Sequence, residues 1–475
     1  MSGFSEGDRR ELRSRVRAAQ HESAQRGRPV CAWLSRPLRG LDPGGVFAAA
    51  GAGERFSWEP PDASVRFVAA GAVSTLEGSG FGRLRDVAEQ AAALFAGSAP
   101  LPASPLDGPL LTGGFAFSSA GQEGAWRGFA PARFVLPEHL VVARADRASH
   151  TVAILARPHG DADALVSAAE ASWRALADPM RRGAPSSQAR IAERDETSPT
   201  FRASATPSPE RFRALVRRAL DAIRDGRFEK VVLARCCTLS RSEGFDADRV
   251  FDALRAANPS CFRVAVGFGG ATLLAATPER LLRVDGREIR TSALAGSAPR
   301  GRSPEEDARL AAQLRESKKE QEEHALVVRA LRGALEACCE RLSVPESPEV
   351  LRLDAISHLH TPIAGRLRAD APRSILELAA LVHPSPAVAG APRAAALAWL
   401  RANERASRGW YAGAIGWFAP GGDGELAVAL RTLLLRGDDA LLHAGAGIVA
   451  GSSPEGELEE TRLKLRGGLA ALLEL

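Results

Sequence analysis

The chain is organised around one stretch near its C-terminus, Gly445-Ala-Gly-Ile-Val-Ala-Gly-Ser-Ser-Pro-Glu-Gly-Glu-Leu-Glu-Glu-Thr-Arg-Leu-Lys464. An apolar run broken by glycines, typical of a strand, leads into Ser453, a residue type that caps helices. Pro454 then takes the first helical position, where proline is best tolerated. The stretch therefore predicts a strand that passes directly into a helix.

One face of this expected helix carries charge of both signs. Glu457, Glu460 and Lys464 are spaced i, i+3 and i+7, so they share a face. Such a face can bind a divalent cation together with an anion, and the free N–H groups at a helix start favour negative charge. Gly445 and Gly447 would let the backbone approach a ligand closely. The alternative is a solvated acidic helix in which Glu460 and Lys464 form an ordinary i,i+4 pair.

Length and composition limit the class of protein. The 475 residues suffice for two or three ordinary domains or one large one. The 62 basic residues barely exceed the 57 acidic ones, and both are interspersed, so no nucleic-acid partner is expected. The six cysteines lack C-x-x-C spacing. The N-terminus has no apolar signal core, and no apolar run is long enough to span a membrane. We expect a soluble, cytoplasmic monomer without a membrane partner.

The first part of the chain alternates short apolar runs with Gly and Pro, a pattern typical of antiparallel strands. The expected strands are Val46–Ala50, Arg66–Ala70, Gly113–Phe117, Leu140–Arg144 and Thr151–Leu155. Helical periodicity predicts helices over Gly82–Ala96 and Asp161–Ala177. The segment Pro179–Pro207 is rich in Pro, Ser, Arg and Thr and has no periodicity, so it is expected to be a linker or a long surface excursion.

The second part contains clearer helix signals. Ser208 and Pro209 begin a helix that stops at Gly226, and a buried-strand pattern follows from Phe228. S-x-x-E capping boxes at Ser303 and Ser317 begin two more helices, the second running to about Arg341. Further strands and loops are expected over Leu351–Ile356, Gly413–Phe418, Leu426–Leu435 and Leu441–Ala450. The whole pattern favours an α+β protein with large antiparallel sheets.

A second pair of carboxylates lies on the helix that starts near Ser317. Glu320 and Glu323 are three residues apart, and Glu323 lines up with Val327 at the edge of the apolar stripe. With the acidic pair of the C-terminal helix, they would form two walls of a Mg²⁺ site, because this ion needs only one or two protein carboxylates. His and Cys at zinc spacing are missing, which favours a hard cation.

Two isolated charges suggest acid–base chemistry. Glu279 follows a proline and precedes an apolar pair, so burial would raise its pKa and suit it to general-acid catalysis. The alternative is an ordinary turn glutamate. Lys230 interrupts a buried-strand pattern and could be a base only if desolvated or placed beside another cation. Its alternative is a lysine whose ammonium reaches out to solvent.

These pieces occur together in an order that resembles the chorismate-utilising enzymes, which are related to anthranilate synthase component I. The resemblance covers about Ser208 to the C-terminus. It rests on Phe228–Arg235, Thr277–Leu281, Ala293–Gly301, Glu323-His324, His358–Ile363, His383–Gly390, Arg408–Gly413, Ala429–Arg431 and the opening stretch. Within this family the pattern is most similar to isochorismate synthases. The resemblance implies a single two-layered α/β sandwich on antiparallel sheets with helices outside, in which residues 1–200 contribute strands and helices and residues 208–475 form the chorismate-binding catalytic region.

The resemblance also implies a role for each site residue. Lys230 would activate water for attack at C2 of chorismate, and Glu279 would protonate the departing C4 hydroxyl. Glu323 and Glu460 would bind Mg²⁺, with Glu320 and Glu457 in its outer shell. The substrate would be held by Gly296, Tyr411, Arg431, Gly445 and Lys464. The implied reaction interconverts chorismate and isochorismate, and the expected pathway is menaquinone synthesis, because siderophore-pathway members tend to be shorter at the N-terminus.

Enzymes of this family with other activities typically differ from this sequence in the residue at a single position. Anthranilate synthases typically carry glutamine in place of Lys230, and aminodeoxychorismate synthases carry lysine in place of Ala295. A salicylate synthase, which goes on to expel pyruvate, remains the alternative, although Leu359–Pro362 and Ala387-Val388 are more similar to the non-lyase members. A catalytically silent chorismate-binding protein is the rival from another class. The departures from the family pattern are Glu320, where aspartate is common, and Ser297 and Ser385, where threonine is common.

Overall fold

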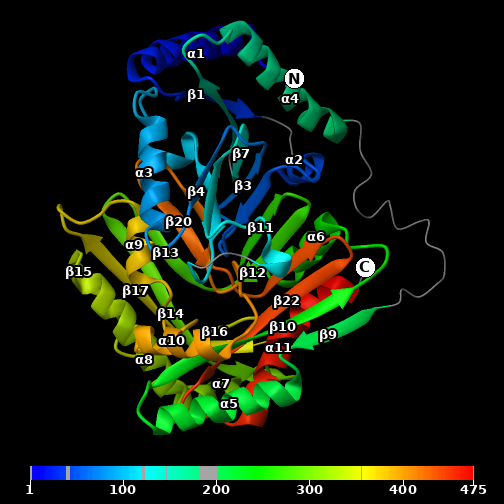
Figure 1. Ribbon diagram of the computed structural model, residues 1–475, viewed down its shortest axis with the longest axis vertical. Coiled ribbons are helices and arrows are strands. Elements are labelled where there is room, and N and C mark those ends of the chain that lie inside the picture. Colours follow the sequence, from blue (N-terminus) through cyan, green and yellow to red (C-terminus); the bar gives the residue numbers. More distant parts are fainter. Residues whose placement is uncertain are drawn as a thin grey trace.

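The computed structural model describes residues 3–38, 43–119, 123–145, 147–181, 201–354 and 356–473. Two antiparallel sheets form its centre (Figure 1). The first contains, in spatial order, β1 (Val30–Leu38), β8 (Ala148–Ala156), β7 (His139–Arg144), β3 (Val65–Ala70), β2 (Arg55–Glu59), β11 (Phe262–Phe268), β12 (Ala271–Thr277), β21 (Thr432–Arg436), β22 (Asp439–Ile448), β10 (Lys230–Ser240) and β18 (Gly390–Ala391), with β9 (Arg202–Thr206) also paired to β10.

The second sheet is built in the same way from distant parts of the chain. Its strands, in spatial order, are β15 (Cys339–Ser343), β17 (Ile356–Leu367), β14 (Glu288–Pro299), β13 (Arg280–Asp285), β20 (Gly424–Val428), β19 (Ala414–Phe418), β5 (Leu111–Phe115), β6 (Ala132–Leu136) and β4 (Ser74–Gly78), with β16 (Glu349–Arg352) paired to β17. Both sheets therefore contain strands from before residue 160 and from after residue 260.

The main core lies between the inner faces of the two sheets. Phe67 of β3 meets Trp417 of β19 edge to face, with 5.8 Å between the ring centroids, and so joins one sheet to the other. Trp58 and Trp410 are fully buried in the same cluster. Alternating apolar residues on both inner faces are what holds such a two-sheet sandwich together. A second apolar cluster fills the space between the outer face of the first sheet and its helices.

Helices cover the outer faces. They are α1 (Glu6–Arg26), α2 (Pro43–Ala49), α3 (Arg83–Phe95), α4 (Ala162–Arg181), α5 (Pro209–Arg224), α6 (Ala247–Ala257), α7 (Pro304–Glu316), α8 (Lys318–Glu336), α9 (Ile375–Val382), α10 (Arg393–Asn403) and α11 (Pro454–Leu473). α8 packs on β14 of the second sheet, and α11 packs on β22 of the first, beside α5 (Figure 1). The expected α+β sandwich of antiparallel sheets with outer helices is confirmed. Within the described ranges, no helix combines the length and apolarity that a membrane crossing needs.

Most elements form where the sequence predicts them. β3, β5, β7, β8, β19 and β22 overlap the expected strands, and α3, α4, α5, α7, α8 and α11 overlap the expected helices. Ser208 caps α5 through the N–H of Arg211, and Ser453 caps α11 through the N–H of Gly456. Local capping and periodicity were sufficient for these elements, because their signals do not depend on distant partners.

Two boundary predictions are wrong. Val46–Ala49, predicted within a strand, belongs to helix α2, because a short apolar run fits either structure and Val46 and Phe47 are both buried there. α8 stops at Glu336 rather than Arg341, since Cys339–Ser343 is drawn into β15 beside β17. The segment expected over Leu351–Ile356 contains the end of β16 and the first residue of β17.

Two longer segments also differ from expectation. The predicted strand Leu426–Leu435 is two strands in different sheets, β20 in the second and β21 in the first. The crossing between them contains Arg431, whose φ of +50° lies in the left-handed region. In the expected linker Pro179–Pro207, residues 202–206 form β9 and α4 extends to Arg181, whereas residues 182–200 lie outside the described residues.

Candidate active site

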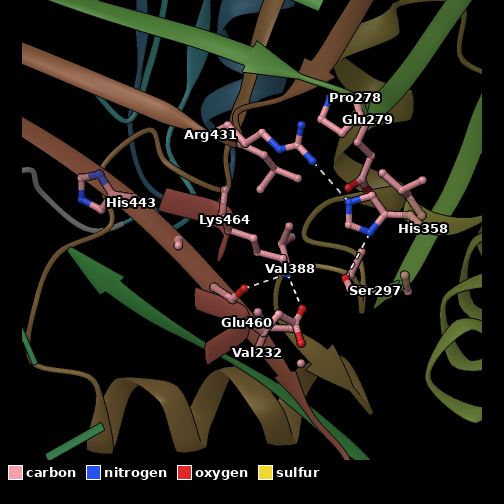
Figure 2. A pocket seen from close by; sticks show the side chains of 18 of the residues that line it. Val232, Pro278, Glu279, Ser297, His358, Val388, Arg431, His443, Glu460 and Lys464 are labelled. Carbon is pink, nitrogen blue, oxygen red and sulfur yellow. Dashed lines mark hydrogen bonds and ion pairs between the residues drawn. The ribbon is translucent and has the colours of Figure 1, made fainter. Parts of the chain in front are cut away.

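A cavity opens between the two sheets, where α8 and α11 meet strand ends. Figure 2 shows side chains from β10, β14, β17, β22 and α11 around it. Its lining carries charged side chains of both signs, which suits a small polar ligand. The residues of the predicted site that line it are Glu279, Gly296, Glu323, Tyr411, Arg431, Gly445, Glu460 and Lys464. The other three predicted residues lie just outside the lining. Lys230 contacts Glu323 and Glu320 contacts Ser297, both of which line the cavity. Glu457 shares Lys319 with Glu320.

Lys230 is the first residue of β10 and has no exposed surface. Its Nζ lies 2.9 Å from Oε1 of Glu323, which projects from α8. Gly447 of β22 makes room for the pair, because a Cβ there would collide with Glu323 Oε1 and lie 3.0 Å from Lys230 Cε. The alternative of a lysine that reaches out to solvent is therefore wrong.

Glu320 of α8 fixes the backbone of strand β14. Its Oε2 accepts a hydrogen bond of 2.9 Å from the N–H of Ser297. The strand pairing of β14 with β17 slips between Ala295 and Ser297, and Gly296 at this bulge has a φ of +78°. A Cβ at Gly296 would lie 3.1 Å from Glu320 Oε2. The bulge therefore turns Gly296 and Ser297 into the cavity and depends on Glu320 for its shape.

Lys319 joins the two acidic helices and was not predicted as a site residue. Its Nζ lies 3.1 Å from Glu320 Oε1 on α8 and 3.0 Å from Glu457 Oε1 on α11. The only available sequence signal was a lysine beside the first carboxylate. Burial and the neighbouring Glu460 raise the pKa of Glu457 to about 7. Oε2 of Glu457 is buried without a hydrogen-bond partner among the described residues.

Glu460 and Lys464 form the expected i,i+4 pair, but inside the cavity wall rather than on a solvated face. Their side chains are 2.6 Å apart, and Lys464 Nζ also donates to the carbonyl of Gly445 at 2.9 Å (Figure 2). Burial opposes ionisation of Glu460, but the ammonium of Lys464 outweighs it and holds the pKa of Glu460 below its ordinary value.

Glu279 lies in the connection between β12 and β13 and is buried. Its carbonyl accepts from the N–H of Val428 at 2.9 Å, and its N–H donates to Oγ1 of Thr277 at 3.4 Å. Burial raises the pKa of the carboxyl to about 8, against the opposing effect of Lys230 and Lys464. Glu279 is therefore protonated at neutral pH, and the alternative of an ordinary turn glutamate is wrong.

Arg431 and His358 form the wall beside Glu279 (Figure 2). Nη2 of Arg431 lies 3.4 Å from Nε2 of His358, and Nδ1 of the same imidazole lies 3.0 Å from the carbonyl of Gly296. Because a carbonyl only accepts, Nδ1 carries the proton and Nε2 accepts from Arg431. Burial and Arg431 lower the pKa of His358 to about 3, so the ring is neutral. Among the described residues, no carboxylate forms an ion pair with Arg431.

Tyr411 and Arg408 complete the lining. Tyr411 is buried and stacks on His443, with 5.0 Å between the ring centroids. A Cβ at Gly445 would lie 2.9 Å from the Tyr411 hydroxyl, which explains the glycine. Arg408 donates to the carbonyls of Val388 and Val232 at 2.8 and 2.7 Å. Sequence reasoning named neither Arg408 nor His358 as a site residue, although both lie within quoted motifs.

The acidic residues fit a Mg²⁺ site that a ligand completes. Among the described residues, no group of three or more His, Cys, Asp or Glu side chains could hold a metal by itself. Glu323 and Glu460 nevertheless both line the cavity. Glu457, one turn before Glu460 on α11, has a buried Oε2 without a hydrogen-bond partner among the described residues. Two carboxylates, with water and substrate oxygens, are the donor set that Mg²⁺ accepts.

The fold and the cavity place this protein in a class of known enzymes. The structure of MenF, the menaquinone-specific isochorismate synthase from Escherichia coli, superposes with a TM-score of 0.76, at 25% sequence identity over 96% of this chain and 99% of that one. The model of the chorismate binding enzyme family matches residues 16–473. The chain therefore belongs to the chorismate binding enzyme family.

Full-length relatives carry the name of one activity. The salicylate biosynthesis isochorismate synthase of Pseudomonas aeruginosa is 38% identical over 97% of this chain and 94% of its own length. The isochorismate synthase MenF of Bacillus subtilis is 32% identical over 98% of both chains.

Proposed function

We propose that this protein is an isochorismate synthase, an isomerase that interconverts chorismate and isochorismate. The observation that carries the proposal is that Glu279, a buried carboxyl with a pKa raised to about 8, lines the same cavity as Arg431. The buried amine of Lys230 lies directly behind this lining, paired with Glu323. The names of its full-length relatives support the same activity. The proposed reaction adds water at C2 of chorismate and removes the C4 hydroxyl as water, so no other reactant is consumed.

Substrate binding follows from the charges of the cavity. Chorismate carries two carboxylates, and Arg431 faces the cavity without a carboxylate partner among the described residues. Lys464 supplies a second cation, although its ammonium is shared with Glu460. The backbone at Gly296, which lines the cavity and carries no side chain, can approach a carboxylate closely. Charge-assisted bonds from a guanidinium fix both the position and the orientation of such a group.

The proton transfers use two groups in opposite states. Glu279 donates its proton to the departing C4 hydroxyl, for which a pKa of about 8 is well matched. Lys230 accepts a proton from the attacking water. An amine is a base only when it is neutral. In this proposal Lys230 loses its proton and acts as a base when Glu323 pairs with another cation and no longer stabilises the ammonium. His358 stays neutral and holds Arg431 and the bulge at Gly296 in place.

Mg²⁺ is proposed as the cofactor, held by Glu323 and Glu460 with Glu320 and Glu457 around them. When bound, it would supply the positive charge that offsets a substrate carboxylate between the two acidic helices. Lys319 would keep Glu320 and Glu457 oriented toward the same place. Titrating the protein with Mg²⁺ in the presence and absence of chorismate, by calorimetry, tests the assignment; unchanged binding in Glu323→Gln and Glu460→Gln variants would contradict it.

The pathway expected from chain length, menaquinone synthesis, stays a prediction. The length argument is weakened because the relative named for salicylate biosynthesis aligns over 94% of its own length, much as the MenF relative does. Length therefore does not separate the two pathways. Deleting the gene and asking whether menaquinone or an aryl-acid product disappears would separate them.

The decisive experiment is a product analysis. Purified protein is incubated with chorismate and Mg²⁺, the products are separated by chromatography, and pyruvate is assayed in the same tube. We expect isochorismate without enzymatic release of pyruvate. Salicylate with stoichiometric pyruvate would assign the alternative, a salicylate synthase. Binding of chorismate without any product would favour a silent binding protein.

A further inference from the structure

The two helices that carry the acidic residues of the active site are joined by one side chain. α8 packs on β14 of the second sheet, whereas α11 packs on β22 of the first. Among the described residues, the bond of 3.0 Å from Lys319 Nζ to Glu457 Oε1 is the only hydrogen bond or ion pair between these helices. Both residues lie in the first turn of their helix. The direct polar connection between the two acidic walls is therefore a single ammonium group.

The walls carry charge of the same sign. Their four carboxylates are divided equally between the helices, with Glu320 and Glu323 on α8 and Glu457 and Glu460 on α11. Lys230 pairs only with a carboxylate of α8, and Lys464 pairs only with one of α11. Lys319 forms ion pairs with carboxylates of both helices. Lys319 therefore offsets the repulsion between the walls, whereas the other two lysines each stabilise one wall alone.

The same ammonium also connects α11 to the backbone of strand β14. Lys319 Nζ lies 3.1 Å from Oε1 of Glu320, and Oε2 of Glu320 accepts from the N–H of Ser297 at 2.9 Å. Ser297 lies on β14 and lines the cavity. A chain of charge-assisted bonds therefore runs from Glu457 through Lys319 and Glu320 to the cavity lining.

The surroundings of Lys319 hold its side chain in this position. A Cβ at Gly451, in the loop between β22 and α11, would lie 3.4 Å from Cγ of Lys319. The side chain of Lys319 is 26% exposed, so most of it is removed from water. Ser317 and Ser453 cap the two helices beside the bridge. The ion pairs of Lys319 therefore join two helix starts that are themselves held in place.

We propose that Lys319 is a positioning residue, which holds the two acidic walls at the spacing of the cation site before a cation binds. The inference rests on the proposed Mg²⁺ site and goes further, because Lys319 itself binds neither the metal nor the substrate. Without its ammonium, repulsion between the carboxylates separates the first turns of α8 and α11 in the metal-free protein. Only molecules with joined walls then bind the cation well, so the apparent Kd rises as their fraction falls.

Simple electrostatic repulsion predicts a change of the opposite sign. A lysine beside a cation site repels the cation, so removing its charge would by itself tighten Mg²⁺ binding. The positioning role predicts that removing the same charge weakens Mg²⁺ binding. The direction of the change in Kd therefore distinguishes the two roles.

The test is a calorimetric titration of Mg²⁺ into the full-length protein. Lys319→Met keeps the apolar stem and removes the ammonium, and its Kd should rise about tenfold or more. Lys319→Arg can form both ion pairs and should stay within about threefold of the unaltered protein. Lys318→Met is the matched control, because Lys318 is exposed in the same turn and forms no ion pair among the described residues. A Kd that is lower or unchanged in Lys319→Met would overturn the proposal.

Hydrogen exchange in the metal-free protein gives a second readout, which does not depend on metal binding. Lys319→Met should speed exchange in the first turns of α8 and α11 and in the loop at Gly451, while the central strands stay unchanged. Unchanged exchange at these turns would contradict the positioning role. Lys319→Gln retains a donor for Glu457 and should give an intermediate result, so it serves as the second variant if Lys319→Met does not fold.

Two outcomes separate this inference from the proposed function. If the unaltered protein binds no Mg²⁺, the proposed metal site is wrong, and the exchange measurement alone decides whether Lys319 joins the walls. If Mg²⁺ binds, saturating Mg²⁺ should return kcat of Lys319→Met to near that of the unaltered protein, because the cation itself then draws the walls together. A loss of kcat that Mg²⁺ does not restore would assign Lys319 a direct part in the reaction and overturn the proposal.

Discussion

The two sides of the active-site cavity differ in whether their ionisable side chains form ion pairs. On the side of α8 and α11, each glutamate meets an ammonium: Glu323 meets Lys230, Glu320 and Glu457 share Lys319, and Glu460 meets Lys464. On the side of β17 and the β20–β21 crossing, Glu279 and Arg431 have no ion-pair partner among the described residues. Paired charges hold their geometry without a ligand, whereas unpaired buried charges are satisfied only when a ligand arrives.

This difference explains how one cavity can be both rigid and reactive. The paired side holds four carboxylates beside three ammonium groups, so each negative charge has a nearby positive one. The unpaired side keeps a neutral acid and a desolvated guanidinium, which are costly in the free protein. Each of the following predictions tests whether this division of charge is real.

The largest effect is expected from the two proton-transfer residues. Glu279→Gln and Lys230→Ala should each lower kcat by about 10²–10⁴-fold, while chorismate still binds, because binding is assigned to other residues. Their stabilities should differ. Lys230→Ala leaves Glu323 as a buried charge without its partner and should cost about 3–5 kcal/mol of unfolding free energy, whereas Glu279→Gln removes an unpaired acid and should cost little. Near-wild-type turnover in either variant would contradict the corresponding role.

The next effect concerns the unpaired cation. Arg431→Lys keeps the charge but loses the planar fork that binds a carboxylate through two bonds. We expect KM for chorismate to rise about 10- to 100-fold with a smaller change in kcat. Arg436→Lys is the control, because Arg436 ends β21, the strand that follows Arg431, and its described hydrogen bond goes to the carbonyl of Arg127. A KM unchanged in Arg431→Lys would show that the substrate does not rely on this residue.

A larger side chain at Gly447 should separate the ion pair of Lys230 with Glu323. Gly447→Ala introduces a Cβ that collides with Glu323 and touches Lys230, so the ion pair must separate at a cost of about 1–3 kcal/mol. Gly451→Ala is the control: a Cβ at Gly451 would meet only the side chain of Lys319, at an ordinary 3.4 Å, and should be tolerated. Urea unfolding of both variants measures the difference, and equal stabilities would mean that the pair adapts freely.

The pH dependence of kcat and of stability should follow the ionisation of Glu279. Its pKa of about 8 means that the carboxyl donates a proton at neutral pH and loses this ability as the pH rises through 8. We expect kcat to be level below that value and to fall above it. Stability should follow the same direction: the folded-state pKa is raised, so the stabilisation present below the unfolded pKa is lost between about pH 4.5 and 8. In Glu279→Gln this pH-dependent loss of stability should be smaller; an unchanged profile would assign it to other groups.

The smallest effect is expected at the start of α11, outside the charged walls. Ser453→Ala removes the hydroxyl that accepts from the N–H of Gly456 and should cost about 1 kcal/mol. Because Glu460 and Lys464 lie further along the same helix, kcat and KM should change little. A large loss of activity would show that the cap positions the paired charges and does more than stabilise the helix.

The sequence predicts those parts of the fold and site whose signals are local. Ser453 and Pro454 begin α11 as expected, and the i, i+3, i+7 spacing does bring Glu457, Glu460 and Lys464 to one place. The family resemblance adds the lining residues Glu279, Gly296, Arg431 and Tyr411, which no local pattern would join, because they come from different strands and loops.

The sequence does not predict what depends on contacts between distant segments. The apolar run Leu426–Leu435 looks continuous, but it divides between two sheets because its two halves find different neighbours, and Arg431 reaches the cavity only through that crossing. Lys319 is an ordinary helix lysine until α11 places Glu457 beside it.

The amino-acid sequence by itself thus determined the class of fold, the capped helices and the types of charge that the site would use. Only the tertiary structure decided which of these charges are paired and which are left for a ligand. The physical reason is that ionisation and pairing depend on burial and on atoms a few ångströms away. Such neighbours can come from distant parts of the chain, as in the contact of Lys319 with Glu457, 138 positions apart.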